Sequence, residues 1–276
     1  MLAFGWAFHD ETPLVGHMSI TNQLLSDTYP PRFVSFPAFE LRYHYGFNLV
    51  SATWSALSTL PAAWGIDLAT VGLGALTWGL LWSLGERVIG TGKGLWAALL
   101  GLFSAGLAMG VAPENAPLAH ELLGHAVLDG AMLNPPTISY FFQHPWTLGI
   151  PLALAAMVLL TEEELTWKGA AFVGLLLLAL SFSQVVLFVC LLPTAVAVAA
   201  LQHGRFDKDQ ALKMGSIALV VVAVATQLGG LFTPRADPLE SEFAFRLGVT
   251  GSFGTTLEWH LHSFGLPLLL GVAGVA

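Results

Sequence analysis

The sequence predicts an all-α fold: a polytopic bundle of about seven or eight membrane helices, with helices of an outer loop lying against one membrane face. Charged residues make up only 10% of the 276-residue chain, and hydrophobic residues make up 55%. The mean hydropathy is +0.71. Soluble domains carry about 25% charged residues, so this chain has too little polar surface to cover itself in water. Several apolar windows also reach the roughly 17–25 residues that a helix needs to cross a bilayer.

Apolar segments follow one another along the chain, and each predicts a membrane helix. Clear segments cover residues 68–84, 95–112, 146–160 and 215–232, and a last one begins near Trp259. The run 169–201 is too long for one crossing and is interrupted by Ser181, Ser183, Gln184 and Pro193. We therefore predict that it forms two short helices that meet near Ser183.

The segment 46–64 is less apolar, because Ser, Thr, Asn and Pro residues are scattered through it. We predict a helix that lies in or dips into the interface. The distribution of basic residues favours this threading. If 46–64 does not cross, the short connections 86–93, 161–168 and 202–213 share one side and hold six of the ten basic residues: Arg87, Lys93, Lys168, Arg205, Lys208 and Lys213. Short basic loops belong in the cytoplasm.

The opposite, outer side then receives three longer loops, at 9–66, 113–145 and 233–258, and the whole of 1–276 reads as one transmembrane domain. Eight of the nine histidines fall on that side: His9, His17, His44, His120, His125, His144, His260 and His262. Histidine has no strong topological preference, so this skew points to chemistry on the outer face. The alternative, that polar residues simply gather in the longer loops, stays open. Both ends look like interrupted spans, so we expect a piece of a longer protein.

Composition and spacing exclude several functions. The single cysteine, Cys190, excludes disulfides and a thiolate zinc cage. The net charge is −8 and the basic residues form no cluster, which argues against a nucleic-acid partner. In AHELLGH the histidines His120 and His125 are five residues apart, and a zinc-protease helix needs a spacing of four. His120 and Glu121 are instead candidates for lining an external cavity.

The first loop holds the richest pattern. In AFHDETPLVGHMSI, His9, Asp10 and Glu11 directly follow an apolar stub. An amphipathic segment at 17–25, the proline turn SDTYPPRF and the stretch FELRYHYGFNLVSA come next. Neighbouring side chains on a helix diverge by about 100°, so the two carboxylates can have separate roles. One could act as a general base while the other orients a ligand or a metal.

These residues resemble the GT-C superfamily of membrane glycosyltransferases, which use polyprenyl-phosphate sugar donors. The superfamily includes oligosaccharyltransferases, protein O-mannosyltransferases and lipid A aminoarabinose transferases. The likeness is to an uncharacterised prokaryotic branch, and it covers residues 1 to about 60. It rests on an acidic pair, a histidine, a PP turn and a YHY element: Asp10 and Glu11, His17, Tyr29-Pro30-Pro31, and Tyr43-His44-Tyr45. The chain departs from the family in having no D-x-D in the second loop and in having Gln184 where a basic residue is common.

The resemblance implies an inverting transfer of sugar from the lipid-linked donor on the periplasmic face of a prokaryotic inner membrane. It assigns Asp10 as base and Glu11 as its helper. The remaining substrate-binding candidates are His17, Arg32, Arg42, His44, Glu114, His120 and Glu121. Arg and His⁺ suit the donor phosphate. A divalent cation, Mg²⁺ or Mn²⁺, could bridge Glu11 and that phosphate, although the sequence does not demand one.

A function of another class remains open beside it. The chain could be a non-enzymatic membrane subunit, or a transporter-like protein, whose outer loops dock a protein partner. Transporters usually place ionisable residues inside their spans. Here Asp67 lies at the edge of a span, and Gln184 and Gln227 are the main polar intrusions. This distribution disfavours transport and leaves the docking subunit as the alternative.

Overall fold

The computed structural model describes residues 16–33, 36–40, 45–103, 144–162, 164–201 and 205–229. The chain divides into two compact units, Met1–Leu95 with Tyr140–Thr233, and Trp96–Ser139 with Pro234–Ala276. Apart from part of one helix, every described element belongs to the first unit. That unit carries the candidate site.

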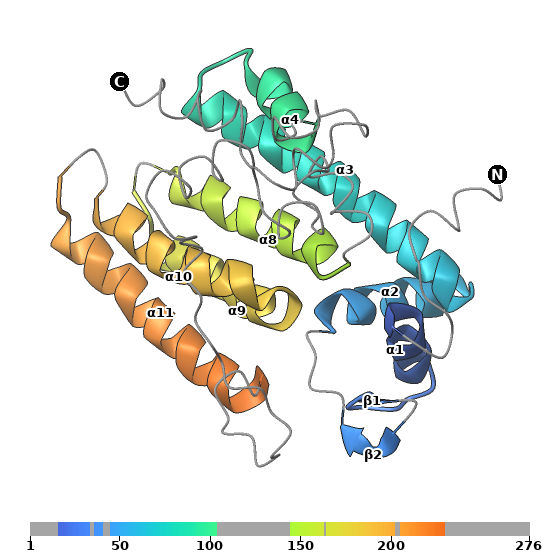
Figure 1. Cartoon of the computed structure of the whole chain (residues 1–276). Helices are drawn as coiled ribbons and strands as arrows, with labels where there is room; N and C mark the ends of the chain where they lie inside the picture. The colour runs from blue at the N-terminus through green and yellow to red at the C-terminus, as the bar shows by residue number, and fades with distance from the viewer. Residues whose placement is uncertain are drawn as a thin grey trace, which may run out of the picture. The chain divides into compact units, whose positions relative to one another are not determined.

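The described residues are mainly helical (Figure 1), as the sequence predicts. The helices are α1 (Gly16–Leu25), α2 (Gly46–Ser58), α3 (Ala62–Val88), α4 (Gly94–Phe103), α8 (His144–Leu160), α9 (Trp167–Ser183), α10 (Val185–Ala200) and α11 (Lys208–Gly229). The all-α prediction needs one addition. Two short strands, β1 (Arg32–Phe33) and β2 (Phe36–Glu40), pair antiparallel with Arg32 opposite Glu40.

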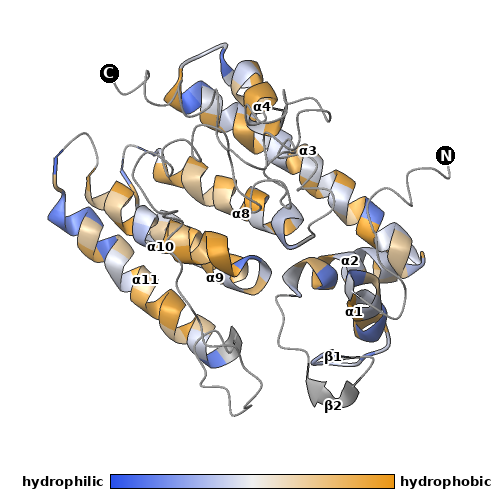
Figure 2. Cartoon of the chain, viewed as in Figure 1, coloured by the Kyte–Doolittle hydropathy of each residue, from blue (hydrophilic) through white to orange (hydrophobic). Residues whose placement is uncertain are grey.

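Two of the described helices are long and apolar enough to cross a membrane, at Ala62–Val88 and Lys208–Gln227. Only 22% and 28% of their apolar windows are buried inside the protein. Figure 2 shows apolar residues along most of α11 and polar residues at its start. The helices α8, α9 and α10 are apolar but shorter. A helical protein with two candidate spans is thus compatible with a membrane protein, and the predicted seven or eight spans stay a prediction.

The predicted non-crossing helix over 46–64 is shorter in the structure: α2 ends at Ser58, and residues 62–64 already belong to α3. The 13 residues of α2 correspond to about 20 Å at 1.5 Å per residue, less than the roughly 30 Å of a hydrocarbon core. Thr59 ends the helix in the left-handed conformation, with φ of 58°, and Pro61 then starts α3. The chain reverses over these few residues, so α2 packs on the first turns of α3.

The predicted break in the run 169–201 lies at Gln184. This residue has an extended backbone, with φ of −152° and ψ of 94°, and it is the C-cap of α9 and the N-cap of α10. Its side-chain oxygen accepts a hydrogen bond from the backbone N–H of Val186 at 3.2 Å. A helix N-terminus lacks partners for its first N–H groups, so the glutamine satisfies one of them and lets the second helix start at once.

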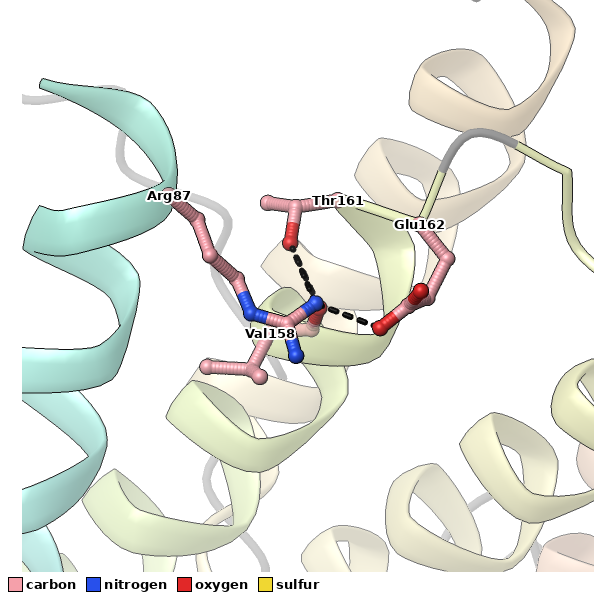
Figure 3. A network of polar contacts seen from close by, with 4 residues as sticks. All are labelled: Arg87, Val158, Thr161 and Glu162. Carbon is pink, nitrogen blue, oxygen red and sulfur yellow. Dashed lines mark hydrogen bonds and ion pairs between the residues drawn. The ribbon is translucent and has the colours of Figure 1, made fainter. Parts of the chain in front are cut away.

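The three short basic connections gather at one end of the unit, which we call the basic end. Arg87 at the end of α3 forms an ion pair with Glu162, and it also contacts Thr161 (Figure 3). Lys213 near the start of α11 donates to the carbonyl oxygen of Leu165 at 2.5 Å. The backbone of Asp207 bonds to Ala200 at the end of α10. Both side chains of the ion pair are about half-exposed, so the pair contributes little to stability, but it shows that the end of α3 lies beside the end of α8.

The opposite end, which we call the α2 end, is defined by close backbone approaches. A Cβ at Gly46 would lie 2.7 Å from Ser183 Oγ, and one at Gly149 would lie 2.6 Å from Gln184 Cβ. The α2 helix therefore meets the end of α9, and α8 meets the helix break. Phe47, Ile66 and Ala69 form a small core here, and a larger core joins α8, α9, α10 and α11.

The threading predicts which sites are reached from each side of the membrane. In a Cys190→Ala background, we expect Lys93→Cys and Lys208→Cys to react with an impermeant maleimide only after the cytoplasmic side is opened. Ser26→Cys, in the predicted outer loop, should react in intact cells. Labelling of positions 26 and 208 from the same side would overturn the threading.

Packing between α2 and α3 predicts a strong effect at Gly65. A Cβ there would overlap Ser55 Oγ and the backbone oxygen of Ser51, so Gly65→Ala forces the helices apart. Overpacking of this kind costs about 1–3 kcal/mol. Thermal unfolding in detergent should show a lower Tm for Gly65→Ala. The matched control is Gly72→Ala on the same helix, where a Cβ meets nothing within 4 Å, and an equal loss in both variants would contradict the packing.

Candidate functional site

The candidate site begins with His17, a predicted cavity-lining residue. It lies on α1 and is only 7% exposed. Its ring packs edge-on against Phe47 of α2, with 6.3 Å between ring centroids. Its Nδ1 lies 3.1 Å from Oδ1 of Asn48, a fully buried residue of α2. The histidine is therefore held in one orientation between two helices.

The hydrogen bonds of Asn48 fix the tautomer of this histidine. The Asn48 amide nitrogen donates to the backbone oxygen of His17 at 2.8 Å and to Thr21 Oγ1 at 3.1 Å. A carbonyl oxygen can only accept, so the NH₂ must face it and Oδ1 must face the ring. In the neutral ring, Nδ1 then carries the hydrogen and Nε2 carries the lone pair.

A layer of buried polar side chains continues from Asn48 along α2 and into α3. Ser51 and Ser55 on α2 and Thr70 on α3 are almost fully buried, and Asp67 on α3 is 8% exposed. Ser51 donates to the Phe47 carbonyl and Ser55 to the Pro61 carbonyl. None of these four residues is among the predicted site residues. The sequence feature that could have identified them is a polar residue inside an apolar segment, as at Asn48 and Asp67.

Arg32, a second predicted site residue, lies exposed at the start of β1. Gln23 of α1 holds its backbone from both sides: Arg32 N–H donates to Gln23 Oε1 at 2.7 Å, and Gln23 Nε2 donates to Arg32 O at 2.9 Å. The hairpin is thereby fixed to α1. The Arg32 side chain thus extends from a backbone position that is fixed to α1, the helix that carries His17.

Two motifs that lie far apart in the sequence contact each other beside this hairpin. Tyr29, before the predicted PP turn, and Tyr45, from the YHY element, pack edge to face with ring centroids 6.0 Å apart. The Tyr45 hydroxyl donates to the Tyr29 hydroxyl at 3.2 Å. The peptide bond between Tyr29 and Pro30 is cis. Tyr29 and Tyr45 therefore belong to one local structure.

The structure thus places two of the nine predicted site residues, on adjacent elements of the first unit. The other predicted residues lie outside the described ranges: Asp10, Glu11, Arg42, His44, Glu114, His120 and Glu121. Their convergence with His17 and Arg32 stays a prediction. Among the described residues, no group of three or more His, Cys, Asp or Glu side chains could hold a metal ion. The predicted metal contact of Glu11 also falls outside those residues.

No protein-family model, no curated protein and no solved structure matches this chain.

The buried amide predicts a measurable loss on truncation. Asn48→Ala removes the buried hydrogen bonds that Asn48 makes with Thr21 Oγ1 and His17 Nδ1, and loss of a buried partner costs about 1–3 kcal/mol. We expect a clear fall in Tm and an altered tautomer balance at His17 by ¹⁵N NMR, where the parent protein shows the Nδ1–H form. Thr53→Ala on the exposed face of α2 is the control and should change neither. A dominant Nε2–H form in the parent protein would contradict the network.

Proposed function

We propose that the chain is an integral membrane glycosyltransferase of the GT-C type, with its α2 end facing the periplasm of a prokaryotic inner membrane. It transfers a sugar from a polyprenyl-phosphate donor to an acceptor at that face. The full protein is a bundle of about seven or eight spans. One observation carries the proposal: a histidine held in a fixed tautomer lies at the end of the unit opposite the basic loops, inside the segment that resembles the superfamily.

Exposed tryptophans support the membrane assignment. On α3, Trp64 is 43% exposed and Trp82 is 41% exposed. They are separated by about 27 Å along the helix axis at 1.5 Å per residue, close to the roughly 30 Å of the hydrocarbon core. Leu68, Val71 and Leu76 are exposed between them. Tryptophan at two levels with apolar side chains between is the pattern of a membrane span.

Charge supports the orientation. The basic end collects Arg87, Lys213 and their neighbouring loops, and short basic loops remain in the cytoplasm. The α2 end then faces outward. The buried polar layer of His17, Asn48 and Asp67 lies at that end, because α1 and α2 pack on the first turns of α3.

The proposed reaction gives each residue a role. The Asp10 carboxylate removes the proton from an acceptor hydroxyl as that oxygen attacks the anomeric carbon. The bond from this carbon to the phosphate oxygen breaks, polyprenyl phosphate leaves, and the configuration inverts. A carboxylate is ionised at neutral pH and can serve as this base. Arg32 would stabilise the phosphate charge, His17 would line the site, and Glu11 would orient the acceptor or hold a divalent cation.

Replacement of the base tests the proposal. In the full-length protein, Asp10→Asn should reduce sugar transfer from a radiolabelled polyprenyl-phosphate sugar by about 10²–10⁴-fold, the usual contribution of a general base. Membrane insertion and Tm should stay unchanged. The control is Asp209→Asn, an exposed carboxylate at the start of α11 near the basic end.

Two outcomes would reject the assignment. Unchanged transfer by Asp10→Asn would remove Asp10 from the reaction. A parent protein that turns over no lipid-linked sugar but purifies in a stoichiometric complex would favour the docking subunit over the enzyme.

A further inference from the structure

The polarity of α2 is reversed relative to a helix on the surface of a soluble protein. Its side toward the protein carries the polar residues Asn48, Ser51 and Ser55, which are at most 2% exposed, beside the buried apolar Phe47 and Ala52. Its outer side carries Leu49, Trp54 and Leu57, which are 41%, 47% and 77% exposed. A helix against water buries its apolar stripe and exposes its polar residues. Here three polar residues are inside and three large apolar residues are outside, so lipid suits the outer side better than water.

The apolar surface does not stop at the end of α2. Leu60 in the short connection is 40% exposed, and Trp64 and Leu68 continue the exposed apolar residues onto α3. This helix is one of the two candidate spans. The outer side of α2 is therefore continuous with the surface of a helix that meets lipid along its length, and the same solvent covers both.

A groove between α1 and α2 opens on this surface. It has a volume of about 400 Å³ and is lined by Leu24, Leu25, Asp27, Tyr29, Leu49, Ala52, Thr53 and Ala56. Leu49 belongs both to the groove and to the exposed apolar side of α2. Asp27 is exposed and would repel a phosphate at the groove. The groove is thus suited to a hydrocarbon chain and unsuited to a phosphate, so a phospholipid can place an acyl chain here only with its headgroup away from Asp27.

We infer that the outer side of α2 and the groove beside it form a lipid-binding surface, embedded in the outer leaflet, whose occupant is the acyl chains of bilayer phospholipids. One chain lies in the groove between Leu24, Leu49 and Ala56. The helix lies within the leaflet, and its buried polar residues Asn48, Ser51 and Ser55 are directed at the protein. This inference depends on the membrane assignment and is independent of sugar transfer.

Spin labels test where α2 lies. In reconstituted full-length protein with Cys190→Ala, labels are placed by Leu57→Cys, Val71→Cys and Lys208→Cys. Val71 is exposed on the candidate span α3, and Lys208 is exposed at the basic end. The Leu57 label should collide readily with oxygen, which concentrates in lipid, and rarely with a water-soluble nickel chelate, as the Val71 label does. Behaviour like that of Lys208 would overturn the inference, and so would protection from both reagents, which would mean that protein covers the surface.

A second measurement addresses the groove. Ala56→Phe places an aromatic ring in the groove and narrows it, whereas Leu57→Phe places the same ring on the outer side, beyond the lining residues. Phospholipid retained through purification should fall by one molecule per chain in Ala56→Phe and stay at the parent level in Leu57→Phe. Equal amounts of retained phospholipid in the parent and both variants would show that no lipid chain occupies the groove. Sugar transfer is read separately, so failure of the glycosyltransferase assignment would not change either lipid result.

Discussion

Asn48 joins α1 to α2 through three hydrogen bonds, and its amide is fully buried. One of those partners is the backbone of His17, so rotation or sliding of α1 would break the contacts together. Buried amides left without partners cost about 1–3 kcal/mol each. Because Asn48 lies on the inner side of α2, it also fixes which side of that helix faces outward. The histidine tautomer and the apolar outer side of α2 are both consequences of this one placement.

Close packing of small residues holds the rest of the unit together. Its larger core is rich in alanine, with Ala156, Ala170, Ala195, Ala199 and Ala225 buried among leucine and valine. Small residues let helix backbones approach closely, and Gly149 and Gly174 do so here against Gln184 and Ile217. Close packing of this kind stabilises helices in lipid, where removal of apolar surface from water contributes little. An apolar exterior and a small-residue interior are what a membrane solvent requires.

Sequence patterns predicted the helices well, because span length, apolar windows and helix breaks are local properties. The helix at 17–25 and the break near Ser183 are confirmed in the described residues, and the helix predicted over 46–64 is present but ends at Ser58. The small hairpin of β1 and β2 was missed, since its register depends on Gln23 holding Arg32 from another element. The partnership of His17 with Asn48 was missed for the same reason. These residues are 31 positions apart, and no periodicity reports a contact between two helices.

The location of the candidate site follows from the way the helices end. Gln184 starts α10 directly after α9, and at this break Ser183 and Gln184 meet Gly46 and Gly149. Side chains at either glycine would push α2 or α8 away. With both close, α2 can lie on the ends of its neighbours and still return through Thr59 and Pro61 into α3. This return puts Asn48 beneath α1. A change that lengthened the turn at Gln184 would therefore displace His17 without touching it, because the position of the histidine depends on where the helices beneath it end.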